Sequence, residues 1–546
     1  MVSETYDKIK ESFRWKDFNR ETFDWDPEEK FNIAHEIDRH ADDPKKVAIF
    51  YISPDNEERK YTYRELRNLT SRFANVLKKL GISKGDRVAV LLSRTIECYI
   101  SFLGIWKIGA IEVPLFTAFE ADAIAYRIKD SEAKVVVTDA KNREKLDKVK
   151  DNLQGIEIIV VSDKQGLGIR KGDLSFWHEI SKASQNFEIV ETSFEDPAVL
   201  EYTSGTTGPP KGTIIPHGGI ICVVSYAKNV LDVRDDDMFW GFADPGWTYG
   251  LLTAGSALLV LGRSLIVYGG VLDVKTWYNI MEKYEVTVFT SAPTLFRKIR
   301  AAGETLPKQY KLKIRRLCSA GEYLDPQTSL WFESNLGVPI ADQYGITEVA
   351  MVVCNYPFMK LKPGSMGKPF IGLDVSLINE NGEEVPTGET GIIAVRRSKY
   401  FLGRGYWKKP EKWEECFING EWFNTGDLAS RDEEGYYYFK GRADDIISTS
   451  GYRVGPGEVE AALMEHPAVA EVGVVGKPDP ERGEIVKAFI VLKPGYEASN
   501  ELAEELKNFV RDKYSKVAYP REIEFLSELP KTESGKVMHR ELRKRA

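Results

Sequence analysis

The chain has 546 residues, of which 42% are hydrophobic and 29% are charged. That composition is typical of a globular protein, and the length indicates more than one folding unit because single cores stop growing at about 250–300 residues. The formal net charge of −8 argues against nucleic acid as a main partner, because phosphate backbones are bound by basic surfaces.

The cysteines, the N-terminus and the apolar stretches indicate the cellular compartment of the protein. The five cysteines are scattered without a CxxC pair, which fits neither a disulfide framework nor a cysteine zinc site and indicates a reducing compartment. The first ten residues are polar and lack the apolar core of a signal peptide. The longest nearly apolar stretch, 250–262, is too short to cross a bilayer. We expect a cytoplasmic protein without a membrane span.

From Asp86 onward, short apolar runs alternate with residues at helical spacing. The run at 87–92 predicts a buried strand, the apolar residues at 96, 99, 100 and 103 predict a helix, and 110–114 predicts the next strand. Further strands are expected at 135–138, 156–161, 286–289 and 316–318. This alternation predicts an α/β fold with mostly parallel sheets covered by helices.

After Tyr356 the pattern changes to short strand-like runs punctuated by Gly and Pro, from 362 to 439, which predicts a β-barrel-like element. The tail predicts a helix at 456–465, strands at 469–475 and 486–492, and a helix at 501–514, enough for a small α+β domain.

We therefore expect a multidomain chain of mixed α/β and α+β class. The large domain would cover 1–442, with αβ subdomains at about 60–200 and 201–356 and a β subdomain at 357–440. A small, mobile α+β domain would cover 443–546.

The run from Tyr202 to Gly212, YTSGTTGPPKG, predicts a phosphate-binding loop. Its glycines allow backbone N–H groups to approach a phosphate, its hydroxyl side chains donate hydrogen bonds, and Lys211 offsets negative charge. The spacing differs from that of a Walker A loop. A surface turn rich in small residues is the structural alternative.

Four further motifs carry polar or charged groups near glycine turns. They are Gln343–Glu348 (QYGITE), Asn424–Asp427 (NTGD), Lys440–Asp445 (KGRADD) together with Ser450–Arg453 (SGYR), and Pro530–Lys536 (PKTESGK). Taken singly, each has a structural explanation: a helix N-terminus, an ordinary turn, a solvated loop and a flexible basic tail. Their joint occurrence in this order argues for a function.

The five motifs together resemble the adenylate-forming superfamily of acyl-CoA synthetases, nonribosomal peptide synthetase adenylation domains and beetle luciferases. The resemblance covers about 61–545. Within it, Ala243–Gly250 (ADPGWTYG) and Glu282–Thr294 are similar to the acetyl-CoA and medium-chain acyl-CoA synthetase branch. The resemblance implies an AMP-forming acyl-CoA synthetase that uses ATP, Mg²⁺ and coenzyme A and acts on a small carboxylic acid.

The resemblance also implies roles in forming an acyl-adenylate. The β- and γ-phosphates would be held by the loop of Thr203, Ser204, Gly205, Thr206, Thr207, Gly208 and Lys211. Thr347 would contact the α-phosphate, and Glu348 would hold Mg²⁺, a hard cation suited to oxygen ligands. The nucleoside would be bound by Gly321, Glu322, Tyr344, Asp427 and Arg442.

Lys536 would bridge the acyl carboxylate and the α-phosphate, so acetylation of this lysine is expected to block the first step. For the second step, the resemblance implies that the C-terminal domain swings about a hinge at Asp444. Gly451 would then border the tunnel for the pantetheine arm of coenzyme A, and Arg453 would contact a phosphate or the neighbouring domain.

The preferred acid is expected to be larger than acetate. Acetate-specific relatives carry a tryptophan that shortens the acyl pocket, and the matching position here is Gly345. Trp247 is expected to form another wall of the pocket. The structural alternative is that Gly345 supplies a positive φ angle. Short, hydroxylated, branched, medium-chain and aromatic acids all stay open.

Three other functions share part of this pattern. A stand-alone ligase that adenylates an acyl or aryl acid and loads it onto a carrier protein would have the same ATP motifs and is the main alternative. A luciferase-like oxygenase has no feature in its favour. A catalytically silent binding protein is disfavoured because Lys211, Glu348, Asp427 and Lys536 are all present. A homodimer stays open.

Overall fold

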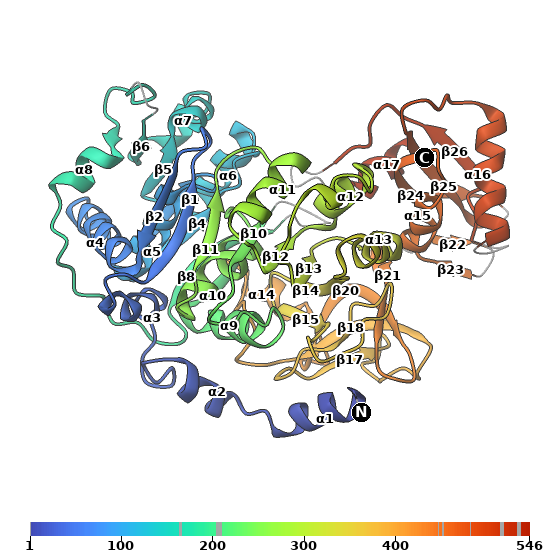
Figure 1. Ribbon diagram of the computed structural model, residues 1–546, viewed down its shortest axis with the longest axis horizontal. Coiled ribbons are helices and arrows are strands. Elements are labelled where there is room, and N and C mark those ends of the chain that lie inside the picture. Colours follow the sequence, from blue (N-terminus) through green and yellow to red (C-terminus); the bar gives the residue numbers. More distant parts are fainter. Residues whose placement is uncertain are drawn as a thin grey trace.

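The computed structural model describes residues 2–162, 166–203, 210–445, 447–449, 452–480, 482–513, 518–531 and 537–546. Within these residues the strands form four β-sheets, with helices packed around them (Figure 1). The mixed α/β, multidomain fold class expected from the sequence is confirmed. No helix in the described ranges is long and apolar enough to cross a membrane.

The first large sheet has seven strands in the order β7-β6-β5-β3-β4-β8-β9. Neighbouring strands are parallel except for β8 and β9, which form an antiparallel pair. Its strands are β3 (Arg87–Leu91), β4 (Ile111–Pro114), β5 (Val135–Asp139), β6 (Glu157–Val161), β7 (Leu174–Ser175), β8 (Pro197–Thr203) and β9 (Lys211–Pro216). The strands expected near 87, 110, 135 and 156 are therefore confirmed.

Helices alternate with these strands along the chain, as the sequence predicted. They are α4 (Tyr63–Lys79), α5 (Ile96–Lys107), α6 (Ala121–Ser131), α7 (Ala140–Asp147) and α8 (Phe176–Lys182). The start of α4 is fixed by a reciprocal capping box, in which the side chains of Thr62 and Glu65 each bind the other residue's backbone N–H. The alternation places the carboxyl ends of the parallel strands at one edge of the sheet.

The second large sheet has nine strands in the order β16-β15-β14-β13-β12-β10-β11-β1-β2. They are β1 (Val47–Ile52), β2 (Glu58–Thr62), β10 (Phe239–Phe242), β11 (Leu265–Tyr268), β12 (Val288–Ser291), β13 (Arg316–Ala320), β14 (Ile340–Ile346), β15 (Ala350–Cys354) and β16 (Lys368–Pro369). The helices around it are α9 (Ile220–Asn229), α10 (Ala257–Val260), α11 (Val274–Lys283), α12 (Pro293–Ala301) and α13 (Pro326–Leu336), with a π-helical turn, η4, over Tyr249–Ser256.

Two details of this sheet differ from the sequence expectation. The strand expected at 286–289 begins at Val288, because the Val286 amide still bonds Met281 O at the end of α11, after Glu285 with φ 51°. Strand β1, which precedes the expected 60–200 subdomain, and β2, which straddles its expected start, join this sheet, and β9 lies in the seven-stranded sheet. The domain limits themselves stay a prediction.

The two smaller sheets follow in sequence. One contains β17 (Val375–Ile378), β18 (Thr390–Arg396), β19 (Phe417–Ile418), β20 (Trp422–Arg431) and β21 (Tyr437–Arg442), with α14 (Pro410–Glu414) between two of its strands. The other contains β22 (Ile447–Thr449), β23 (Tyr452–Val454), β24 (Val469–Asp479), β25 (Gly483–Leu492) and β26 (Glu522–Phe525). The helices α15 (Pro456–Met464), α16 (Asn500–Lys513) and α17 (His539–Arg545) pack beside it (Figure 1). The C-terminal helix and strand pattern agrees with the sequence expectation.

The N-terminal helices α1 (Val2–Ser12), α2 (Trp15–Thr22) and α3 (Ile33–Asp38) were not predicted. The first two lie along the outside of the molecule, with α1 below the sheet that contains β17 and β18 in this view (Figure 1). The indole of Trp15 donates to Gly372 O at 2.8 Å and stacks on Tyr400 with ring centroids 4.3 Å apart. The N-terminal segment therefore packs against residues near 372 and 400, which are far from it in the sequence.

Two carboxyl groups lie buried on one face of the seven-stranded sheet. Glu112 on β4 pairs in register with Val199 on β8, so Glu201, two residues further along β8, projects from the same face. Oε2 of each glutamate is buried without a hydrogen-bond partner in the described structure. Burial raises the pKa of both groups well above the ordinary value, and the charge of Glu201 adds to the effect on Glu112.

Replacement Glu112→Gln is expected to stabilise the protein at alkaline pH. Because the folded pKa lies above the ordinary value of 4.5, the wild-type protein loses stability relative to the variant as pH rises above that value. We expect an advantage of roughly 1–3 kcal/mol at pH 8 that disappears near pH 4. Urea unfolding against pH measures it, with the exposed Glu380→Gln as control. An advantage that grows toward pH 4 would contradict the assignment.

Candidate active site

The two ends of the expected phosphate loop are joined as a β-hairpin. Thr203 at the end of β8 is in register with Lys211 at the start of β9, and the Thr203 hydroxyl donates to Lys211 O at 3.4 Å. The loop residues Ser204, Gly205, Thr206, Thr207 and Gly208 lie outside the described residues. The hairpin fixes where the loop leaves and re-enters the sheet.

Lys211 and Glu348 meet around one tyrosine. The Tyr406 hydroxyl donates to Glu348 Oε1 at 2.7 Å, and Lys211 Nζ lies 4.6 Å from the centroid of the Tyr406 ring. Thr347 and Glu348 occupy the turn between β14 and β15. The alternative that this Thr-Glu pair begins a helix is therefore wrong. An ammonium and a carboxylate from distant segments face the same region.

A second polar cluster joins β14 to the five-stranded sheet that contains β20 and β21. Asp427 on β20 is directly opposite Arg442 on β21, with Oδ1 3.4 Å from the guanidinium, and the Tyr344 hydroxyl donates to Asp427 Oδ2 at 2.6 Å. Burial, and then the charge of Asp427, raises the pKa of Tyr344 well above its ordinary value. Nε of Arg442 is buried without a partner in the described structure. The guanidinium therefore has an unused donor beside a carboxylate.

Gly321 and Glu322 follow the carboxyl end of β13. Gly321 has φ +93°, and a Cβ added there would meet nothing within 4 Å. The Glu322 carboxylate accepts from Arg297 at 2.7 Å and from the Thr294 hydroxyl at 2.6 Å, both on α12. Arg297 was missed by the sequence analysis because no spacing signal links it to Glu322.

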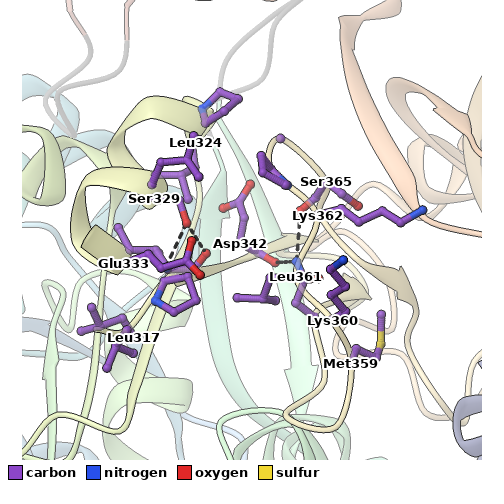
Figure 2. Close-up of a pocket in the computed structure, with 18 of the residues that line it drawn as sticks. Leu317, Leu324, Ser329, Glu333, Asp342, Met359, Lys360, Leu361, Lys362 and Ser365 are labelled. Carbon is purple, nitrogen blue, oxygen red and sulfur yellow. Dashed lines mark hydrogen bonds between the residues drawn. The ribbon is translucent and has the colours of Figure 1, made fainter. Parts of the chain in front are cut away.

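A pocket of about 330 Å³ lies beside the amino-terminal half of β14 (Figure 2). Its lining includes Asp342, Leu317, Leu324, Ser329 and Glu333. The Asp342 carboxylate accepts from the Ser319 hydroxyl at 2.6 Å, and burial raises the pKa of Asp342 to about 7. Asp342 also escaped the sequence analysis, although it directly precedes the QYGITE run.

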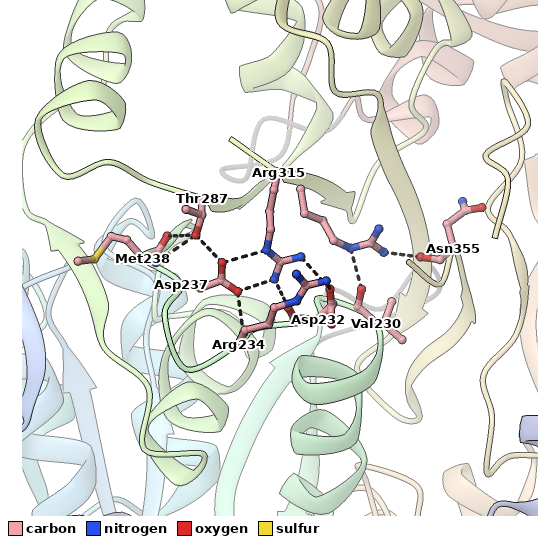
Figure 3. Close-up of polar contacts among 9 residues, drawn as sticks. Val230, Asp232, Arg234, Asp237, Met238, Thr287, Arg315 and Asn355 are labelled. Carbon is pink, nitrogen blue, oxygen red and sulfur yellow. Dashed lines mark hydrogen bonds and ion pairs between the residues drawn. The ribbon is translucent and has the colours of Figure 1, made fainter. Parts of the chain in front are cut away.

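Arginines at the start of β13 hold the sheet beneath this pocket. Arg315 Nε donates to Asp237 at 2.9 Å, and the same carboxylate accepts from the Thr287 hydroxyl at 2.7 Å (Figure 3). Arg315 also pairs with Asp232 at 2.7 Å. These contacts join the start of β13 to the segments before β10 and β12, which fixes the start of the strand that Gly321 follows.

The two residues expected to line an acyl pocket lie in different surroundings. Trp247 packs against Phe116, which follows β4, with ring centroids 5.3 Å apart. Gly345 lies within β14, and its φ is not among the positive values of the described glycines. A Cβ there would lie 2.4 Å from Ala350 O. The positive-φ explanation is therefore wrong, and close backbone approach requires the glycine.

Four of the predicted site residues, Asp444, Gly451, Arg453 and Lys536, come from the C-terminal part of the chain. Asp444 lies in a 3-10 turn, η6 (Ala443–Asp445), and Arg453 lies in β23, but neither side chain is among those described. Gly451 and Lys536 lie outside the described residues. Their roles stay predictions.

Comparisons with known proteins agree on one family. Residues 37–407 match the family described as AMP-binding enzyme, and residues 458–536 match the AMP-binding enzyme C-terminal domain. The acetyl-coenzyme A synthetase of Bacillus subtilis (strain 168) is 41% identical over 94% of this chain and 90% of its own length.

Solved structures give the same result. An acyl-CoA synthetase from Brucella canis is 40% identical, with a TM-score of 0.79 over 99% of this chain and 98% of that one. The anthranilate CoA ligase AuaEII, in complex with anthranoyl-AMP, is 32% identical, with a TM-score of 0.86 over 94% of this chain and 97% of that one. The family match covers more than half of the chain, and the relatives align along nearly its whole length. The chain therefore belongs to the AMP-binding enzyme family.

Proposed function

We propose that the protein is an AMP-forming acyl-CoA synthetase. A carboxylate oxygen attacks the α-phosphorus of ATP, the bond to pyrophosphate breaks, and an acyl-adenylate forms. The coenzyme A thiol then loses its proton and attacks the acyl carbon, and AMP leaves. The observation that carries the proposal is the meeting of Lys211 and Glu348 around Tyr406, next to the hairpin that bears the glycine-rich loop. Both steps bring anions together, so positioned charge dominates the catalysis.

The described residues fit a nucleotide bound where the two large sheets meet the five-stranded sheet that contains β20 and β21. Lys211 and the loop after Thr203 would bind the β- and γ-phosphates, and Thr347 the α-phosphate. Asp427 would accept from the ribose hydroxyls, with the unused Nε of Arg442 as a further donor. Gly321, Glu322 and Tyr344 would border the adenine.

A Mg²⁺ ion fits beside Glu348. The described residues contain no cluster of three or more His, Cys, Asp or Glu that would form a closed metal site. Mg²⁺ is commonly bound by one or two carboxylates together with substrate phosphates and water, which a single glutamate facing a phosphate loop can provide. When bound, the ion would neutralise charge on the phosphate oxygens.

The second step would use the C-terminal domain, proposed to cover 443–546. Its rotation about Asp444 would withdraw Lys536 and bring Gly451 and Arg453 to the site, where the pantetheine arm of coenzyme A enters. Hinge closure of a domain is an established way to complete a catalytic site. A cytoplasmic location belongs to the same proposal.

The acid is proposed to be larger than acetate. The support is the lack of a side chain at Gly345 beside the proposed acyl region, where each further buried methylene would contribute about 0.8 kcal/mol. The close approach of Ala350 O is a structural reason for glycine at this position. Substrate preference therefore decides whether Gly345 also enlarges the acyl pocket.

The function is tested by AMP release with ATP, Mg²⁺ and acids from acetate to decanoate, including hydroxy and aromatic acids. We expect acid-dependent AMP that requires coenzyme A and is largest above acetate. Preference for acetate would contradict the acyl-pocket proposal alone. Pyrophosphate exchange without any turnover on adding coenzyme A would favour a ligase that loads a carrier protein. No acid-dependent reaction would contradict the function.

Replacement Asp427→Asn is expected to weaken ATP binding selectively. The variant loses a charged acceptor for the ribose, so the KM for ATP should rise about tenfold or more while the KM for the acid changes little. Steady-state kinetics measure both. Asp374→Asn is the control, because Asp374 also pairs with an arginine, Arg396, at 2.8 Å, but at an exposed position. An unchanged KM for ATP would contradict the assignment.

A further inference from the structure

The segment 402–407 bridges two parts of the proposed site that are far apart in sequence. On one side it pairs with β9, since Ile214 N donates to Gly405 O at 2.9 Å. On the other side, Gly403 N donates to Glu348 O at 2.8 Å. Backbone hydrogen bonds therefore connect the phosphate-loop hairpin, through the segment 402–407, to the turn that carries Glu348.

Tyr406 stands at the centre of this bridge with little freedom to move. Its side chain is buried, at 4% exposure, and its backbone forms a bridge with Thr213 on β9. The hydroxyl donates to Glu348 Oε1 at 2.7 Å, and the ring presents its π system to Lys211 Nζ at 4.6 Å. An ionised carboxylate only accepts hydrogen bonds, so the tyrosine is the donor.

The arrangement keeps two opposite charges apart. In the described structure Lys211 and Glu348 each contact Tyr406, and no ion pair joins them. A direct pair would satisfy both groups with each other and leave less charge for a ligand. With Tyr406 between them, Glu348 Oε2 and the lysine ammonium stay available to a cation and to phosphate oxygens.

We propose that Tyr406 is a positioning residue, which orients Glu348 for Mg²⁺ and holds Lys211 for the phosphates of ATP. The proposal rests on the acyl-CoA synthetase function above and adds a residue to its machinery. A packing role is the competing explanation, because the ring also makes an edge contact with Trp413 at 5.5 Å. The substitution Tyr406→Phe separates the two, since it keeps the ring and removes only the hydroxyl.

The test compares wild type with Tyr406→Phe in two measurements at varied Mg²⁺ concentration. One is acid-dependent pyrophosphate exchange, and the other is the rise in Tm that ATP produces. Losing a hydrogen bond to a charged group should raise the half-saturating Mg²⁺ concentration about tenfold in both. The rise in Tm that ATP produces without Mg²⁺ should equal that of wild type, because phenylalanine keeps the ring that faces the Lys211 ammonium.

Tyr436→Phe is the matched control. Tyr436 is equally buried and its hydroxyl donates to Lys360 O at 2.8 Å, away from Glu348. We expect its Mg²⁺ dependence to equal that of wild type. In a Glu348→Gln background, Tyr406→Phe should cause no further Mg²⁺-dependent change in Tm, because the two residues act through one interaction.

Four outcomes would contradict one of the two proposals. Equal Mg²⁺ curves for Tyr406→Phe and wild type, or equal shifts for both tyrosine variants, would overturn the proposal in favour of packing. An undiminished effect of Tyr406→Phe in the Glu348→Gln background would overturn it as well. A wild-type protein that binds Mg²⁺ and ATP but shows no acid-dependent exchange would contradict the proposed function, while the Tm measurement still tests Tyr406.

Discussion

A continuous ladder of backbone hydrogen bonds underlies the proposed site. It runs from β8 to β9, from β9 to the segment 402–407, and from that segment to the turn at Glu348. A reaction between anions needs cationic and metal-binding groups at fixed separations, and flexible side chains hold such separations only when their backbones are rigid. The ladder supplies that rigidity across three segments distant in sequence.

Close packing explains why small residues occur along this ladder. A Cβ at Gly403 would lie 2.7 Å from Thr213 Cγ2 and 3.1 Å from Glu348 O. At Gly219 a Cβ would lie 2.5 Å from Leu402 O. These glycines are required by the approach of neighbouring backbones rather than by contact with a ligand. The same reasoning applies to Gly345, where the absent side chain has a structural cause as well as a proposed role in substrate choice.

The sequence was most informative where function and local structure coincide. The alternation of strands and helices predicted the parallel central strands of both large sheets, and the hairpin from Thr203 to Lys211 is bounded by residues of one short motif. Asp427 and Arg442 lie in two separate motifs, and adjacent strands place them opposite each other. Local patterns predict elements well, because each element forms from residues close in the chain.

Contacts between distant segments were not predictable in this way. Tyr406 and Glu348 are 58 residues apart, and Arg297 and Glu322 are 25 apart. Neither pair has a periodic signal. The addition of β1 and β2 to the second sheet, and the docking of Trp15 on Gly372, depend on tertiary packing that overrides sequence order.

The most direct test of this account is amide hydrogen exchange in the ligand-free protein. If the ladder is a preformed scaffold, the amides of Gly403 and Trp407 should exchange as slowly as that of Ile214 in β9, because all three donate to backbone carbonyls. The exposed segment at 497–499, which lies outside any helix or strand, gives the fast reference. Exchange of Gly403 and Trp407 at the rate of that segment would contradict the account, since the charged groups would then be assembled only when a ligand binds.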